Sequence, residues 1–471
     1  MKITYIGHAS VLVEAGGIAI LSDPWWRGPC FGAQWWNYPL PCVSAIEDCQ
    51  IDYIYVSHGH HDHLHPGTLR TLSKHAKVLV SAKTELASSI RELGFDVIEM
   101  NDGQIVTLGS LGVSCCIMNT HGGDTLMTIS DGTEVCVNLN DALHSAPDAV
   151  QRDFIERLKA IHSRIDYAFC GYGGASHFPN CYVIPGKNRE ATAARRQQHF
   201  NRQWARIIAE LQPVYGFPFA ADVVFLEDDL FWVNEVTHNA ERPTAAFRAL
   251  YPDSQVITKD IAPGFVIENG TVTNEMLRQP VLAADLRTIC AEQIGRANRH
   301  GTVDEQAIKE VANLLQGNLD ACAEYLSSYD RDYRFLIRFR NSELGIHIEK
   351  RGQSLSLAPT RATSDQGYEV AFTTRIPYLK WTLTRQYGDE ILFVGSGGIF
   401  EYFQCAKTKT NLHRELIHLL RKNAPPPVTA KHSRIVYKAK QLIKRVLGRT
   451  DVDLYDLNAW TVYTMDRPKR S

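Results

Sequence analysis

The sequence predicts an α/β protein in which short strands alternate with helices. Short apolar and largely β-branched runs recur along the chain, as in Ile51 to Val56 and Val135 to Leu139. Segments with helical character lie between such runs, for example Lys83 to Leu93, which stops at Gly94. At 471 residues the chain is long enough for two or three domains, each with a core of its own.

The first residues predict a β-hairpin. Lys2 to Glu14 alternates between apolar and polar side chains and ends near Gly16 and Gly17, which favour a turn. Ile18 to Leu21 then predicts the returning strand. Because strand-like residues follow Met1 directly, no secretory signal is expected.

The composition excludes several broad classes of protein. A formal net charge of -2 argues against a general nucleic-acid binder. No apolar run approaches the ~20 residues that a membrane span needs. The 11 cysteines form no C-x-x-C pair, and they predict reduced thiols. A cytoplasmic protein with a small-molecule substrate is expected.

A histidine-rich loop follows the strand predicted at Ile51 to Val56. It runs from Ser57 to His63 as Ser-His-Gly-His-His-Asp-His, and Pro66 to Leu72 predicts the helix after it. Neutral imidazoles and a carboxylate at two-residue spacing can converge on one point, as a transition-metal site requires. A single histidine is more often a hydrogen-bonded structural residue, but the joint pattern predicts a metal site.

Two further candidate ligands follow later strands. His121 lies just past the strand predicted at Val113 to Met118. Asp141 lies just past a hairpin predicted from Leu126 to Ser130 and Val135 to Leu139. Each alone is an ordinary polar loop residue, but together they add ligand types to the histidine loop.

A tryptophan-rich loop precedes the histidine loop. Two tryptophan pairs lie in a stretch broken by glycine and proline, and Arg27 follows the first pair; the tryptophans are Trp25, Trp26, Trp35 and Trp36. One interpretation is a small satellite core. The other is a substrate-binding aromatic wall, with Arg27 available to an anion. Composition alone leaves both open.

A glycine-rich loop follows the strand predicted at Ile165 to Phe169. It combines backbone freedom with polar side chains, a composition suited to a polar ligand. We expect Ser176, Asn180 and Tyr182 to bind substrate and His177 to be catalytic, as a proton donor or as a further metal ligand. The alternative is a glycine-rich linker.

The chain divides into four predicted regions: a first domain over residues 1–265, a helical connector over 270–330, a small α+β domain over 331–410 and a basic tail over 411–471. The third region resembles the sterol-carrier type of domain. In the tail, Lys431 to Arg449 predicts a basic amphipathic helix. This helix suits peripheral contact with an anionic membrane or a partner, and equally packing on its own domain.

The histidine motif resembles that of the metallo-β-lactamase superfamily, and residues 1–265 resemble the CMP-N-acetylneuraminate hydroxylase-like branch. The motifs that carry the resemblance are Asp23-Pro24-Trp25, Gly28-Pro29, Phe31, Trp35-Trp36, His58 to His63, Asn140-Asp141, Gly174-Ala175-Ser176 and Pro179 to Tyr182. The resemblance implies an αββα sandwich. It also implies His58, His60 and His121 as ligands of a first metal ion, Asp62 and His63 as ligands of a second, and Asp141 as a bridge.

The sequence departs from these relatives at two points. No cysteine has a histidine at the C-x-H or C-x-x-H spacing of a Rieske centre, so a hydroxylase of this type would need an external electron donor. Hydrolytic members carry a P-x-H histidine where this chain has Ala220, which leaves the second metal to other residues; the candidates to complete it are His177, Asp222 and His238. Oxygen-rich ligation favours iron, with zinc or manganese as alternatives.

The expected function is therefore a metal-dependent oxygenase with two irons, which hydroxylates a polar anionic substrate such as a nucleotide sugar. The alternative is a metal-dependent hydrolase of a phosphodiester, ester or lactone, in which a metal-bound water attacks. A third hypothesis is a scaffold without activity that binds a lipid or partner.

Overall fold

The computed structural model describes residues 1–118, 124–174, 177–238, 240–297, 303–327, 332–352, 354–385, 388–403 and 419–420. They form two compact units. The first takes in residues 1–174 and 194–297, and the second takes in 177–193 and the described residues from 303 onward. The division differs from the predicted one, because residues beyond 265 complete the first unit while 177–193 leave it.

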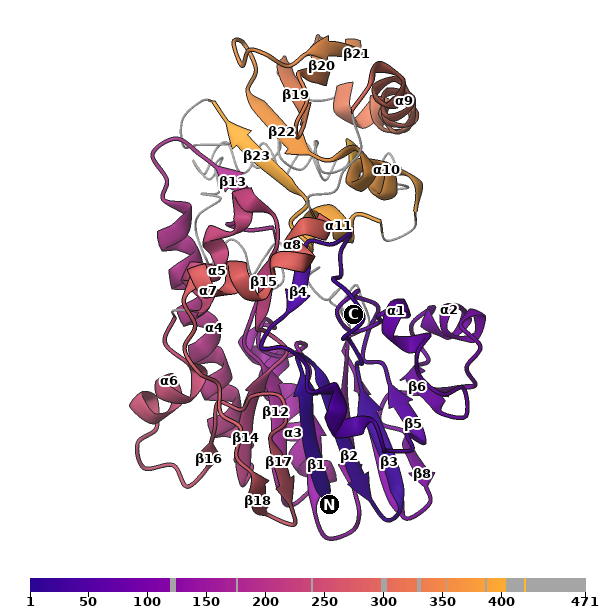
Figure 1. Ribbon diagram of the computed structural model, residues 1–471, viewed down its shortest axis with the longest axis vertical. Helices are drawn as coiled ribbons and strands as arrows, with labels where there is room; N and C mark the ends of the chain where they lie inside the picture. The colour runs from indigo at the N-terminus through magenta and orange to yellow at the C-terminus, as the bar shows by residue number, and fades with distance from the viewer. Residues whose placement is uncertain are drawn as a thin grey trace. The chain divides into compact units, whose positions relative to one another are not determined.

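One sheet of the first unit has eight strands (Figure 1). In spatial order they are β18 (Thr271–Asn274), β17 (Val266–Glu268), β1 (Lys2–Gly7), β2 (Ser10–Ala15), β3 (Ile18–Ser22), β5 (Tyr53–Tyr55), β6 (Lys77–Ser81) and β7 (Val97–Met100). Pairing is antiparallel from β18 to β3 and parallel from β3 to β7.

The other sheet of this unit has seven strands. They are β16 (Ile257–Thr258), β14 (Tyr215–Phe219), β12 (Tyr167–Gly171), β11 (Val135–Asn138), β10 (Thr125–Ser130), β9 (Leu111–Ile117) and β8 (Ile105–Leu108). The hairpin of β10 and β11 confirms the strand pair predicted around Asp131 and Gly132. Pairing is parallel from β16 to β11, so β11, β12 and β14 end at a common edge.

Helices cover the outer faces of both sheets. On the first sheet lie α1 (Pro66–Leu69) and α2 (Leu86–Glu92), and on the second lie α3 (Asp148–Ile161) and α4 (Arg189–Leu211). Successive side chains of β5 point to opposite faces of the sheet. Ile54 packs with α2 on the outer face, whereas Tyr55 joins the core between the two sheets. This arrangement is the αββα sandwich that the sequence predicted.

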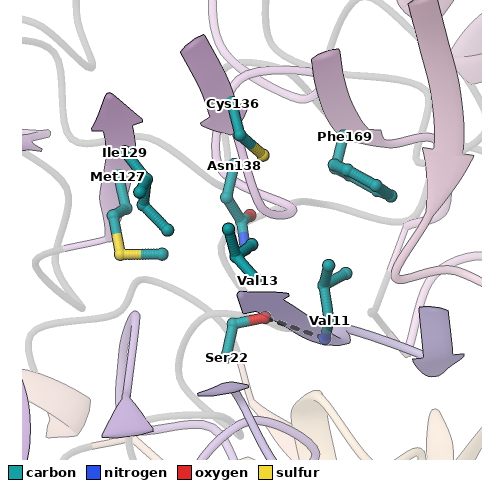
Figure 2. A pocket seen from close by; sticks show the side chains of 8 residues that line it. All are labelled: Val11, Val13, Ser22, Met127, Ile129, Cys136, Asn138 and Phe169. Atoms are coloured by element: carbon teal, nitrogen blue, oxygen red, sulfur yellow. Dashed lines mark hydrogen bonds between the residues drawn. The ribbon is translucent and has the colours of Figure 1, made fainter. Parts of the chain in front are cut away.

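The core between the sheets includes a small cavity. Its lining comes from both sheets, and its volume is about 10 Å³, room for about one water molecule (Figure 2). Ser22 and Asn138 supply the polar atoms of this lining. Both residues lie at strand ends, close in sequence to candidate metal-site residues.

The first hairpin corrects the prediction of one long strand over Lys2 to Glu14. The strand breaks at Gly7 and His8, where φ is 146° and 47°. The register between β1 and β2 shifts at the same place. The left-handed backbone of Gly7 and His8 ends the strict alternation, and it places the His8 side chain among the loops at the strand ends.

Smaller elements complete the first unit. They are the two-stranded pair of β4 (Trp35–Asn37) and β15 (Val223–Phe225), the 3-10 helices η1 (Val43–Ile46) and η2 (Asp228–Leu230), and the helices α5 (Trp232–His238), α6 (Pro243–Leu250), α7 (Ala283–Ile289) and α8 (Ala291–Ala297). In the part of the chain that the structure describes, no helix has the length and hydropathy of a membrane span.

The second unit is an α+β domain. Its sheet has the order β13 (Tyr182–Val183), β23 (Gly398–Tyr402), β22 (Val370–Thr374), β19 (Tyr333–Phe339), β20 (Leu344–Arg351) and β21 (Ser354–Arg361). Its helices are α9 (Glu305–Ser327), α10 (Ile376–Thr384) and α11 (Glu390–Phe393). The basic helix predicted at Lys431 to Arg449 lies outside the described residues.

Candidate metal centre

The histidine loop connects β5 to α1 at the carboxyl end of a buried parallel strand. His65 caps α1, and its Nδ1 accepts a hydrogen bond of 3.1 Å from the Thr68 backbone N–H. The Thr68 hydroxyl in turn accepts bonds from the backbone N–H groups of Trp26 and Arg27. The end of the loop at α1 is thus fixed by hydrogen bonds.

Two groups of ligand-type side chains lie together at this edge. One comprises His58, His63 and Asp141, the other His8, Asp62 and His63, and the ligand atoms in each group lie within 4.8 Å of one another. His63 Nε2 lies 3.6 Å from Asp62 Oδ2 and 3.7 Å from Asp141 Oδ2. Because His63 belongs to both groups, the two candidate positions are adjacent.

Several of these ligand atoms have no hydrogen-bond partner among the described residues. They are Asp62 Oδ1, His63 Nε2 and Asp141 Oδ1, all buried. An unsatisfied buried polar atom costs about 1–3 kcal/mol, and more when charged, so three in one place call for a ligand. Nitrogen and oxygen donors of these types suit a transition-metal ion. The residues present therefore fit a metal centre.

A buried carboxylate orients His63. Asp23 Oδ2 accepts from His63 Nδ1 at 3.0 Å and from the Ser57 hydroxyl at 2.7 Å, and Asp23 Oδ1 accepts from the Ser57 backbone N–H at 2.8 Å. With the proton on Nδ1 held by Asp23, the Nε2 lone pair of His63 is directed toward Asp62 and Asp141. Asp23 thus fixes the ring nitrogen that faces the candidate metal.

His58 and His60 complete this cluster. His58 Nε2 lies 2.7 Å from His60 Nδ1, and His58 Nδ1 lies 3.9 Å from Asp141 Oδ1. The Asn140 side-chain amide donates to His58 Nδ1 at 3.2 Å. Asn140 has a left-handed backbone, with φ of 53°, which turns the chain sharply before Asp141.

In the metal-free chain the surrounding charges favour a protonated His63 imidazole at the position where a metal ion could bind. Burial by itself lowers the pKa of His63, but the carboxylates of Asp62, Asp141 and Asp23 raise it to about 10. Burial by itself raises the pKa of Asp141, but the imidazoles of His58, His63 and His60 lower it to about 2. The pKa of Asp62 is lowered in the same way, chiefly by His63 and His8. Fixed carboxylates around a protonated imidazole are suited to exchange that proton for a metal ion.

Of the six metal ligands expected from the sequence, the structure brings five together: His58, His60, Asp62, His63 and Asp141. His121 lies outside the described residues. His8 was missed as a ligand candidate; its Nε2 lies 3.1 Å from Asp62 Oδ2. The signal that could have revealed it is the Gly-His step that interrupts an alternating strand.

The residues expected to complete the second metal lie elsewhere. Asp222 pairs with Arg242 and Arg278, and His238 Nδ1 lies 2.7 Å from Arg278 Nη2. Ala220, in the position of the missing histidine, donates its backbone N–H to the His8 carbonyl at 3.1 Å. His8 therefore brings an imidazole to the neighbourhood where hydrolytic relatives are expected to carry their last histidine.

The tryptophan loop packs mainly as a core beneath the centre. Trp25 is fully buried, and its ring contacts His8 at 5.1 Å between centroids. Trp35 and Trp36 are also buried, in strand β4. Of the five residues in the predicted wall, only Trp26 and Arg27 reach the surface. These positions favour the satellite core over the aromatic wall.

The residues of the glycine-rich loop belong mostly to the second unit. His177 Nδ1 lies 2.8 Å from the Phe393 carbonyl, and Tyr182 is buried with its ring stacked on Phe400. Asn180 is buried in the same unit, and Ser176 lies outside the described residues. These residues are therefore grouped with a different unit from the metal ligands, and their predicted roles at the substrate stay predictions.

Comparison with known proteins identifies the sandwich. Residues 2–138 match the family model described as a beta-lactamase superfamily domain. This part of the chain is similar to a beta-lactamase superfamily domain. The match covers β1 to β11 and the whole histidine loop, and together with the ligand geometry it indicates a metal-dependent enzyme.

The similarity to individual proteins extends further along the chain. A putative Rieske 2Fe-2S iron-sulfur protein of Mycolicibacterium smegmatis is 30% identical over 250 residues, which are 50% of this chain and 46% of that protein. The cytidine monophosphate-N-acetylneuraminic acid hydroxylase of Mus musculus is 27% identical over 374 residues, 76% of this chain and 61% of the hydroxylase. The chain thus spans about half to three fifths of the length of these relatives.

Among solved structures, a metallo hydrolase from Ignicoccus hospitalis aligns with a TM-score of 0.38 and 18% identity. The alignment covers 56% of this chain and 97% of the hydrolase. The resemblance to the hydroxylase-like branch therefore rests on the sequence relatives.

Proposed function

We propose that this protein is an oxygenase-type metalloenzyme that uses two iron ions to hydroxylate a polar anionic substrate such as a nucleotide sugar. The observation that carries the proposal is the donor set. Each of the two ligand groups combines two imidazoles with one carboxylate. Two histidines and one carboxylate with open positions are typical of non-haem iron oxygenases.

The chain's own residues would divide the work of holding the metals. His58 and His60, with His121, would hold one ion, and His8, Asp62 and His63 the other. Asp141, which lies near both His58 and His63, would be shared by the two. When bound, the iron would supply the redox chemistry that dioxygen activation requires. Asp23 would keep His63 in one tautomer, and the buried ring of Trp25 would keep water away from the His8 side of the centre.

The proposal requires an external source of electrons. This chain carries no cysteine–histidine pairs at the spacing of a Rieske centre. Relatives named as Rieske iron-sulfur proteins and as a nucleotide-sugar hydroxylase support both the type of reaction and the type of donor. The donor would be a reduced iron-sulfur centre or a flavin outside the residues of this sequence.

One observation favours a hydrolase instead. The two ligand groups share His63, which brings the two candidate metal positions close together. Adjacent metals that clamp an attacking water and a leaving oxygen are typical of hydrolytic two-metal sites. The substrate would then be a phosphodiester, an ester or a lactone.

An isotope experiment separates the two reactions. Iron-loaded protein is incubated with CMP-N-acetylneuraminate, a chemical reductant and ¹⁸O₂, and products are analysed by mass spectrometry. The proposal predicts a product that carries one ¹⁸O atom, and no product from a double variant with His58→Ala and His60→Ala. Related nucleotide sugars are tested in the same way.

Turnover that proceeds without oxygen and takes its new oxygen atom from H₂¹⁸O would contradict the proposal and support the hydrolase. The control variant is Arg202→Gln. Arg202 is exposed on α4, so its loss should leave the reaction unchanged.

A further inference from the structure

Three side chains bind consecutive carbonyl groups just after β12. The backbone oxygens of Tyr172, Gly173 and Gly174 accept from Gln197 Nε2 at 3.1 Å, from His144 Nε2 and from Arg196 Nη1 at 3.0 Å, respectively. Two of the donors, Arg196 and Gln197, are neighbours on α4. The segment that follows β12 is thereby fixed, and the His144 and Arg196 side chains are brought to the same edge of the sheet.

This edge adjoins the candidate metal centre. A Cβ atom placed on Gly171 would lie 2.8 Å from Asp141 Cα and 3.1 Å from His144 Nδ1. His144 also packs edge-on against Phe200, with ring centroids 5.2 Å apart, and the Arg196 guanidinium lies over the same Phe200 ring at 4.9 Å. Gly171 thus lies close to both Asp141 and His144, and Phe200 contacts both His144 and Arg196.

Arg196 differs from the other partly buried arginines of this unit. Arg206, Arg242 and Arg278 each pair with an aspartate. Arg196 makes no ion pair with any described residue, and its one hydrogen bond there goes to the Gly174 carbonyl. A guanidinium carries five N–H donors, so most of them remain available to a ligand.

The charge of this guanidinium persists at neutral pH. Burial lowers the pKa of Arg196 to about 10, with no nearby carboxylate to offset it. A partly buried cation without a counter-charge is less well solvated than one in water, and an anionic ligand would offset part of that cost. The side chain is partly exposed, so such a ligand can reach it.

We propose that Arg196, beside His144, forms an oxyanion-binding site at the edge of the metal centre, for a carboxylate or phosphoryl group of the substrate. The planar guanidinium fork matches both groups. The inference rests on the proposed function, which expects an anionic substrate. It adds that Arg196 binds the negatively charged group of that substrate. Arg196 acts as a positioning residue and takes no part in proton or electron transfer.

In a purely structural alternative, Arg196 serves only to donate a hydrogen bond to the Gly174 carbonyl. The two roles differ in their need for charge. Arg196→Gln keeps an N–H donor for the Gly174 carbonyl but removes the charge, whereas Arg196→Lys keeps the charge but loses the fork. Arg202→Gln removes one exposed charge from the same helix and serves as the matched control.

The test measures binding of inorganic phosphate and of acetate to the full chain by isothermal titration calorimetry, at fixed ionic strength. Each variant is titrated metal-free and zinc-loaded, and circular dichroism checks that it melts like the wild type. Arg196→Gln should lose on the order of 10- to 100-fold in affinity for the preferred anion in both forms, as expected for charge-assisted hydrogen bonds. Arg196→Lys should lose less, and Arg202→Gln should match the wild type.

Preference for phosphate would indicate a phosphoryl group, and preference for acetate a carboxylate. Equal affinity of wild type and Arg196→Gln, absence of binding to the wild type, or binding only when zinc is present would overturn the inference. If Arg196→Gln fails to fold, the affinity of Arg196→Lys relative to Arg202→Gln decides. Iron content and ¹⁸O incorporation are measured separately, so the proposed function can fail while the anion site stands, and the reverse.

Discussion

The first unit contains two buried clusters of charged side chains that differ in how their charges are balanced. In the metal centre, Asp62 and Asp141 lie beside His63, and buried ligand atoms lack partners among the described residues. In the second cluster, which we call the arginine cluster, Asp222 binds both Arg242 and Arg278.

The arginine cluster is balanced by its own side chains. Arg242 Nη1 lies 3.2 Å from Asp222 Oδ1, and Arg242 Nε lies 3.5 Å from Asp260 Oδ1. Arg278 Nε lies 3.2 Å from Asp222 Oδ2, and its guanidinium also covers the Tyr38 ring. His238 Nδ1 accepts from Arg278 Nη2, and His238 Nε2 donates to the Val223 carbonyl. Two arginines and two aspartates leave no net charge for a ligand.

The difference teaches how a structural ion network is distinguished from a ligand site. Perturbed pKa values occur in both clusters, since the pKa of Asp222 is lowered as that of Asp141 is. In the arginine cluster the buried atoms without a hydrogen-bond partner include Arg242 Nε and Asp260 Oδ1, which form an ion pair with each other at 3.5 Å. In the metal centre they are ligand atoms of two carboxylates and an imidazole that converge on one place. The following predictions separate the two clusters by stability and by metal affinity, from the largest expected effect to the smallest.

Replacing Asp222 should affect stability most. Asp222→Ala leaves Arg278 buried without its carboxylate, which should lower the free energy of unfolding by about 3–5 kcal/mol. Iron and zinc affinity should be unchanged. Urea unfolding of the metal-free chain gives the first quantity and a competition titration with a chelator gives the second. A loss of metal affinity would place Asp222 in the metal centre.

Replacing Asp141 should change metal affinity strongly and the free energy of unfolding only modestly, the reverse of the effects expected for Asp222. Asp141→Asn removes a candidate ligand, so metal affinity should fall by more than ~100-fold, beyond the effect of losing an outer-shell partner. The free energy of unfolding of the metal-free chain should fall by no more than about 2–3 kcal/mol, which corresponds to the shift in the Asp141 pKa. Wild-type metal affinity in this variant would exclude Asp141 as a ligand.

Replacing Asp23 tests the outer partner of His63. Asp23→Asn leaves the bond to Ser57 feasible but no longer fixes the tautomer of His63, so metal affinity should fall about 10- to 100-fold. The matched control is Asp260→Asn in the arginine cluster, which should leave metal affinity unchanged. Equal metal affinity in both variants would show that Asp23 has no such role.

Stability of the metal-free chain should depend on pH through His63. Its folded-state pKa of about 10 exceeds the ordinary value, so its stabilising contribution is complete below pH 6.5 and is lost as pH rises toward 10. Between pH 7 and 9 the free energy of unfolding should fall, by at most about 1.4 kcal/mol per pH unit.

Metal-loaded protein should lack this slope, because the metal replaces the proton. His63→Gln should remove the slope from the metal-free chain. Chemical denaturation at several pH values measures both, and a slope that persists in His63→Gln would assign it to another group.

Much of the sandwich could be predicted from sequence because strand periodicity is local. Val135 to Leu139 and its hairpin partner were identified from a β-branched run and an Asp-Gly turn. The four candidate ligands within the histidine loop could be proposed for the same reason, since they lie within six residues, from His58 to His63. Local spacing sufficed wherever the chain keeps its ligands close together.

Long-range pairings could not be predicted from sequence. His8 reaches Asp62 only because the backbone turns at Gly7, and the two residues are 54 positions apart. Arg278 binds Asp222 from 56 positions away in the sequence. Because this pairing is not visible in the local sequence, Asp222 was kept as a candidate metal ligand. The departure of residues 177–193 into the second unit depends on the pairing of β13 with β23, which no local pattern reveals.

The central claim is that His8, His58, His60, Asp62, His63 and Asp141 form a centre for two iron ions. Its most direct test is the metal content and Mössbauer spectrum of protein purified without oxygen from cells grown on ⁵⁷Fe, with Asp141→Asn and Asp222→Ala compared. The account predicts two coupled irons per chain that oxidise in air, retained in Asp222→Ala and lost in Asp141→Asn. Two zinc ions per chain, with no spectral change in air, would contradict it.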